Sequence, residues 1–87
     1  MKIKIKLLGN LKKLCESSEI SMELERATLG DVLKIISKEY PRLSEEIFSQ
    51  GMIDEHYTIL LNNSPSELGS ELEDGDEIII FLPLAGG

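Results

Sequence analysis

The first half of the chain opens with two stretches in which apolar and polar side chains alternate. Residues 2–7 alternate lysine with isoleucine or leucine, and residues 20–24 alternate Ile20, Met22 and Leu24 with serine and glutamate. A period of two predicts a strand with one buried face. We therefore predict two strands joined as a hairpin with a long loop, with Leu8 on the lysine side of the first strand.

A change of period after residue 27 predicts the main helix. Thr28 with Asp31 three residues later resembles a capping box, and Tyr40-Pro41 should end the helix, because the residue before proline disfavours helical geometry. Residues 43–50 are predicted to add a short helical turn. The positions at helical spacing, which should face the core, are Leu29, Val32, Leu33 and Ile36.

The last third of the chain returns to strand patterns. Residues 57–61 are predicted to form a third strand, and residues 62–65 form a turn. Residues 73–76, around Gly75, are predicted to form a tight turn that leads into the final strand at residues 77–82. This order of elements indicates an α+β domain with a mixed sheet of four to five strands and one main helix packed on one face.

If the last strand lies beside the first, the helix serves as their crossover and the two strands run parallel. That is the ubiquitin-like β-grasp arrangement. We assign residues 1–82 to this domain and residues 83–87 to a flexible C-terminal tail, because Gly86 and Gly87 lack a Cβ and termini are poorly ordered.

The final strand is apolar on both faces, yet one helix can cover only one of them. Ile78, Ile80 and Leu82 should face one way, and Ile79 and Phe81 the other. In a parallel pairing Leu8 lies at the same end of the sheet as Phe81. We therefore expect an exposed patch beside the start of the tail, made by Leu8, Ile79 and Phe81, with Pro65 as a further candidate. Such a patch usually marks a binding surface, unless a loop or a second copy covers it.

Composition narrows the classes of partner and compartment. A net charge of −7 argues against nucleic acid, whose binding depends on Lys and Arg, and favours a partner with a basic face. No apolar stretch approaches the length of a membrane span, so we expect no membrane partner and a cytoplasmic protein. The single cysteine, Cys15, excludes an internal disulfide and agrees with a reducing compartment.

Candidate chemistry within the domain is sparse. His56 is the only histidine and has no second ligand at metal-binding spacing, so we predict no metal site. Cys15 has no activating partner evident in the sequence and is expected to be a packed or partly exposed thiol. Asp74 and Asp76 flank Gly75 and are interpreted first as turn formers. Their second interpretation is as docking charges, together with Glu73 and Glu77.

The end of the chain is the most specific part of the sequence. Residues 72–77, Leu-Glu-Asp-Gly-Asp-Glu, lead through an apolar run to residues 81–87, Phe-Leu-Pro-Leu-Ala-Gly-Gly. This pattern resembles the small subunit of molybdopterin synthase, and Leu61-Asn62-Asn63 and residues 3–8 extend the resemblance over the whole chain. Two departures, Leu82 before Pro83 and Ile80 before Phe81, stand where the family often has a second proline and a second aromatic. They could alter the choice of partner.

The resemblance implies a carrier and not an enzyme. An activating enzyme of the ubiquitin-activating type would use ATP to adenylate Gly87, and a sulfur donor would then convert its carboxylate to a thiocarboxylate. Gly86 and Gly87 would enter the active site of the large synthase subunit, where the sulfur passes to a pterin precursor. The carrier needs no bound cofactor. The implied partner-binding residues are Phe81, Leu8, Ile79, Pro83, Leu84 and Ala85.

The sequence is also compatible with other functions, because the β-grasp fold serves several tasks. A sulfur carrier for thiamine synthesis is one, although such carriers are usually shorter. A ubiquitin-like modifier that joins Gly87 to lysines of other proteins is a second. A pure interaction module with an incidental Gly-Gly end is a third.

Overall fold

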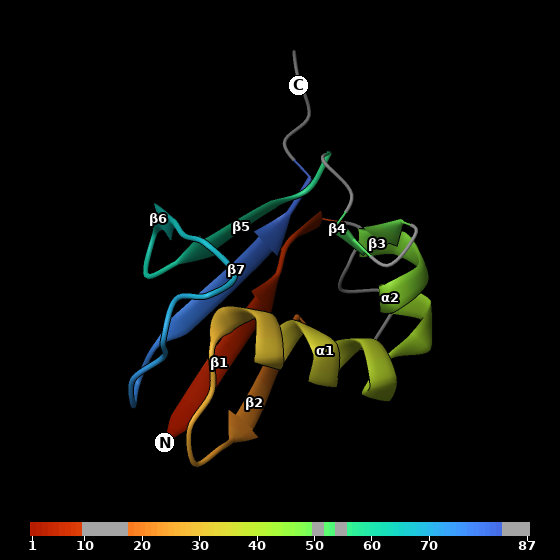
Figure 1. Cartoon of the computed structure of the whole chain (residues 1–87). Coiled ribbons are helices and arrows are strands. Elements are labelled where there is room, and N and C mark those ends of the chain that lie inside the picture. The colour runs from red at the N-terminus through yellow and green to blue at the C-terminus, as the bar shows by residue number, and fades with distance from the viewer. Residues whose placement is uncertain (10–17, 50–51, 54–55, 83–87) are drawn as a thin grey trace.

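The computed structural model describes residues 1–9, 18–49, 52–53 and 56–82 of the 87-residue chain. Its main sheet has five strands in the order β2-β1-β7-β5-β6 (Figure 1). A separate two-stranded sheet pairs β3 with β4. The strands are β1 Lys2–Leu7, β2 Glu19–Glu23, β3 Phe48–Ser49, β4 Met52–Ile53, β5 Thr58–Leu61, β6 Ser64–Pro65 and β7 Glu77–Phe81.

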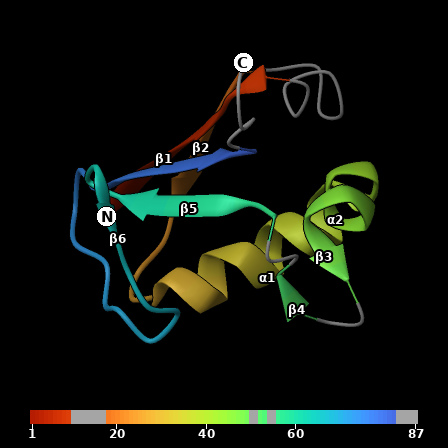
Figure 2. The same ribbon diagram turned by 90° about the horizontal axis from the view of Figure 1, so that it is seen from above.

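The sheet is mixed, as the sequence predicts. β1 pairs antiparallel with β2, and β1 pairs parallel with β7, with Ile5 opposite Ile78. Helix α1, Leu29–Glu39, lies in the connection between these parallel strands and crosses one face of the sheet (Figures 1 and 2). The α+β, β-grasp prediction is therefore confirmed.

Helix α1 begins and ends where the sequence predicts. The Thr28 hydroxyl accepts a hydrogen bond from the Asp31 backbone N–H at 3.2 Å, and the Asp31 carboxylate accepts one from the Thr28 N–H at 2.9 Å. Hydrogen bonding of the Asp31 carboxylate to Thr28, first to its backbone N–H and second to its side chain, lowers the pKa of this carboxyl below its ordinary value of 3.8. Tyr40 is the C-cap of α1 and also the N-cap of α2, Pro41–Ile47.

The core lies between α1 and the inner face of the sheet. The four helix positions predicted to face the core are all buried, together with alternate residues of β1, β2 and β7. Hydrophobic burial of this kind is the main stabilising contribution to a small domain. The buried side chains are Ile3, Ile5, Leu7, Ile20, Met22, Ala27, Leu29, Val32, Leu33, Ile36, Leu43, Ile47, Leu72, Ile78 and Ile80.

Several boundaries differ from the prediction. The second strand, predicted over residues 20–24, is Glu19–Glu23. The second helix starts at Pro41, since proline is well tolerated in the first helical turn, and it ends at Ile47. Phe48 begins β3 and does not continue the helix. The third strand starts at Thr58, and the expected turn at residues 62–65 includes the two-residue strand β6. β7 ends at Phe81, so Leu82 lies outside the sheet with 38% of its surface exposed.

None of the helices formed by the described residues is long and apolar enough to cross a lipid bilayer.

Candidate functional site

The face of the sheet opposite α1 carries the residues that the sequence predicts to bind a partner. Ile79 lies in register between Lys6 of β1 and Leu60 of β5, and Phe81 lies opposite Thr58. Side chains alternate along a strand, so these residues share one face while their neighbours Ile78 and Ile80 are fully buried on the other. Ile79 and Phe81 are both half-buried.

We define the tail-proximal patch as Leu8, Leu60, Ile79 and Phe81. Leu8 follows β1 and remains at the edge of this patch, because its backbone N–H donates to the Ile80 carbonyl at 3.1 Å. Its side chain is 48% exposed. The patch lies at the end of the sheet where β7 leads into the last residues of the chain (Figure 1). The structure thus brings together the three residues predicted from the sequence, and their role in binding stays a prediction.

Leu60 is the member of this patch that the sequence analysis missed. It pairs with Ile79 on one side and with Pro65 of β6 on the other. The alternation of side chains within residues 57–61 could have predicted its position. Ile59 and Leu61 pack against the core, so Leu60 must face outward. Pro65 is exposed at the sheet edge beside Leu60, which supports its place as a further candidate.

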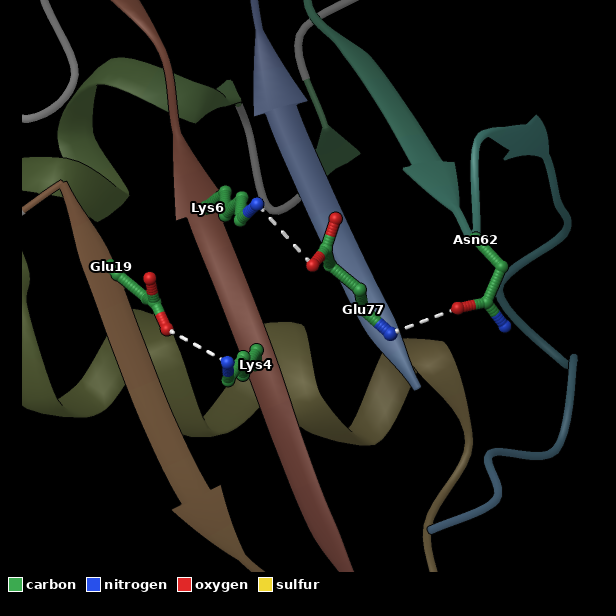
Figure 3. A network of polar contacts seen from close by, with 5 residues as sticks. All are labelled: Lys4, Lys6, Glu19, Asn62 and Glu77. Atoms are coloured by element: carbon green, nitrogen blue, oxygen red, sulfur yellow. Dashed lines mark hydrogen bonds and ion pairs between the residues drawn. The ribbon is translucent and has the colours of Figure 1, made fainter. Parts of the chain in front are cut away.

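A band of paired charges borders the apolar patch on the same face. The Lys6 ammonium lies 3.4 Å from the Glu77 carboxylate, and the Lys4 ammonium lies 3.6 Å from Glu19 (Figure 3). All four side chains are a third or more exposed, so each pair contributes little to stability. The charges of Lys6 and Glu77 neutralise one another beside Ile79.

The acidic turn before β7 is a structural element. Gly75 has a φ of 88°, and Asp76 accepts hydrogen bonds from the Glu73 backbone N–H at 2.7 Å and from the Asn62 side chain at 2.9 Å. The Asp74 carboxylate accepts one from the backbone N–H of Lys2 at 2.6 Å. These bonds agree with the first interpretation of Asp74 and Asp76, as turn formers.

The position of this turn also weakens the docking interpretation. β7 runs from the turn toward the tail, so the turn lies at the opposite end of the sheet from Phe81 (Figure 1). The four steps from Glu77 to Phe81 alone span about 13 Å at the usual rise of a strand. Exposed charges are largely screened beyond about 8 Å at physiological salt, so Asp74 acts only weakly on a partner bound at the patch.

Several predicted residues lie outside the described part of the chain. They are Cys15 and the whole tail: Pro83, Leu84, Ala85, Gly86 and Gly87. The division into residues 1–82 and 83–87 therefore stays a prediction. Within the described residues, no three His, Cys, Asp or Glu side chains are grouped so that they could hold a metal ion.

Comparison with known proteins places this chain in a family. The sequence profile of the ThiS family matches residues 5–87. Small archaeal modifier protein 1 of Haloferax volcanii is 30% identical over 84 residues, which are 94% of this chain and 97% of that protein. Its crystal structure superposes with a TM-score of 0.90 at 28% identity, and each chain is covered completely (100%).

Two further solved structures share the fold. One is a Pyrococcus furiosus protein provisionally assigned as subunit 1 of molybdopterin converting factor, with 31% identity, a TM-score of 0.81 and coverage of 97% of this chain and 99% of that one. The other comes from a complex of subunits 1 and 2 of molybdopterin-converting factor from Helicobacter pylori. It has a TM-score of 0.70 at 24% identity, with 100% of both chains covered, and shows likeness of fold alone. The chain therefore belongs to the ThiS family of ubiquitin-like small modifiers and sulfur carriers.

Proposed function

We propose that this protein is a carrier whose reacting group is the C-terminal carboxylate of Gly87, and that other proteins supply the active sites. The observation that carries the proposal is the tail-proximal patch, which lies at the C-terminal end of β7, six residues before Gly87 in the sequence. A partner that covers Leu8, Ile79 and Phe81 would hold the root of the tail against its own surface. Fixing the root in this way positions the terminal group for reaction.

Activation is required because a free carboxylate is ionised at neutral pH and is a poor electrophile. In the proposed first step a Gly87 carboxylate oxygen attacks the α-phosphorus of ATP, and pyrophosphate leaves. The product is an acyl-adenylate, a mixed anhydride with AMP as a good leaving group. Hydrosulfide, the sulfur nucleophile, then attacks the Gly87 carbonyl carbon and displaces AMP, and loss of the proton on sulfur leaves a thiocarboxylate. The adenylating enzyme binds the ATP, so the carrier itself needs no cofactor.

The specific task that we propose is sulfur donation to a pterin precursor in the large subunit of molybdopterin synthase. Support comes from the Phe81-to-Gly87 segment, which resembles that small subunit, and from the 31% identity to the Pyrococcus furiosus protein. The occurrence of the same fold in a two-subunit complex from Helicobacter pylori is consistent with such a pairing.

Protein modification is the second candidate, and one observation favours it. The chain is 30% identical to small archaeal modifier protein 1 over almost its whole length. In that case a lysine amine of a target protein attacks the adenylated Gly87 carbonyl, directly or through a relayed thioester, and forms an isopeptide bond. Both candidates use the same activated terminus, so they differ only in the nucleophile that takes the acyl group.

Reconstitution with the adenylating enzyme of the same organism tests the shared step. With ATP and sulfide as sulfur source, the intact mass should rise by the difference between one sulfur and one oxygen atom. Deleting Gly87, or adding one alanine after it, should abolish this gain while the circular dichroism spectrum stays unchanged. Thiolation of the extended protein at its new end would contradict the proposal.

A further inference from the structure

Strand β2 forms the long open edge of the main sheet. Its pairing with β1 uses alternate residues, because the Leu7 N–H donates to the Ser18 carbonyl and the Leu24 N–H donates to the Met1 carbonyl, both at 2.9 Å. The N–H and C=O groups of Ser21 and Glu23 must then point away from β1. No other described residue forms a backbone hydrogen bond with them on that side.

The two edges of the sheet differ in how they are protected. β6, at the other edge, has only two residues, and one of them is Pro65, which lacks a backbone N–H. β2 has five residues, no proline, and an alternating pattern of exposed and buried side chains. An edge of that length and regularity can pair with a further strand.

Charge on β2 indicates which strand would fit. Glu19 and Glu23 flank Ser21 on the outer face, and within the chain the residues opposite them in β1 are lysines. A second copy of β2, paired antiparallel about Ser21, would place glutamate opposite glutamate, which destabilises a sheet. A strand with Lys or Arg at alternate positions would place opposite charges together. Its intervening side chains would lie on the side of Ile20 and Met22, which face the core.

We propose that the β2 edge binds an extended segment of a partner protein in which basic and apolar residues alternate, and that this segment adds a sixth strand to the sheet. β1 itself, Lys2–Leu7, has this pattern and already pairs with the inner side of β2. The proposed edge is separate from Ile79 and Phe81 of the tail-proximal patch, since β1 lies between β2 and β7. The proposal does not depend on activation of Gly87.

A peptide with the sequence of Lys2–Leu7 and blocked ends is a direct probe. Added to the 15N-labelled full-length protein, it should shift the amide resonances of Ser21 and Glu23 most strongly. The peptide is expected to pair antiparallel with β2, as β1 does. In that pairing the lysines opposite Ser21 and Glu23 exchange backbone hydrogen bonds with them, so the lysine amides of the peptide face β2 and the isoleucine amides face away. N-methylation of the lysine amides should therefore abolish binding, whereas N-methylation of the isoleucine amides should preserve it.

A matched pair of protein variants tests the same contact from the other side. Ser21→Pro removes an outward N–H without touching the bonds to β1, and it should weaken peptide binding by about tenfold or more. Ser21→Ala should bind as the unchanged protein does. The proposal is overturned if the unmodified peptide fails to bind, if its largest shifts fall on the tail-proximal patch, or if methylation of the lysine amides has no effect. The peptide arms use the unchanged protein, so they decide the matter even if Ser21→Pro fails to fold.

Discussion

Truncation of Ile80 should mainly destabilise the fold, and truncation of its neighbour Phe81 should mainly weaken partner binding. The reason is that successive residues of β7 face opposite sides of the sheet. Ile80 has 0% of its surface exposed. Ile80→Ala should therefore destabilise the fold by about 2–5 kcal/mol, the usual cost of such a truncation in a core. Phe81 is half-buried on the outer face, so Phe81→Ala should cost only about 1 kcal/mol, roughly half the value of a fully buried apolar side chain.

Phe81→Ala should weaken binding of a partner more than it lowers the stability of the fold. As an anchor of the tail-proximal patch, Phe81 should contribute about 1–3 kcal/mol to binding of the adenylating enzyme, which corresponds to a roughly 5- to 150-fold rise in Kd. Urea unfolding followed by circular dichroism measures the stability of both variants, and isothermal titration calorimetry measures the Kd for the adenylating enzyme. A loss of stability for Phe81→Ala as large as for Ile80→Ala, or an unchanged Kd, would refute the assignment of Phe81 to a docking surface.

Three further predictions concern the turns and the helix cap. Asn62 has a φ of 51°, accepts a hydrogen bond from the Glu77 N–H at 3.0 Å and donates one to Asp76. In urea titrations Asn62→Ala should therefore lower the free energy of unfolding by about 2 kcal/mol, and Asn62→Gly should lower it by less. The pKa of the Asp31 carboxyl is lowered in the folded state, so the unchanged protein should be more stable than Asp31→Asn at pH values well above 3.8, and this difference in stability should shrink as the pH falls below 3.8. A difference in stability that does not vary with pH in acid unfolding would contradict this. Asp74→Lys should leave the association rate with the adenylating enzyme nearly unchanged in stopped-flow measurements at physiological salt, whereas a severalfold drop that added salt removes would restore the steering role.

The parts of the fold that the sequence predicts well are those in which local pattern and packing agree. Alternation in β1 and the helical spacing of the four buried positions in α1 each correspond to one buried face, and the capping box at Thr28 fixes where α1 begins. The two-faced apolar pattern of β7 likewise predicts both its central place and the outward direction of Ile79 and Phe81.

The sequence predicts less well those features that depend on tertiary pairing. Phe48 and Ser49 form a strand because they pair with Met52 and Ile53. The local sequence alone does not indicate that the helical pattern before Phe48 ends at Ile47. Leu60 joins the patch through its register with Ile79, which requires the order of the strands to be known.

Intact mass spectrometry of the protein isolated from its native host is the measurement that tests the central claim most directly. If Gly87 is the reacting group, a fraction of the chains carries a modified C-terminus at Gly87. The modification is a thiocarboxylate if the protein donates sulfur, or an isopeptide bond to a lysine of another protein if it is a modifier. Fragmentation should locate either change to the last residue. An unmodified carboxylate in every chain, in cells that are actively making molybdenum cofactor and with no lysine conjugates present, would contradict the proposal that Gly87 is the reacting group.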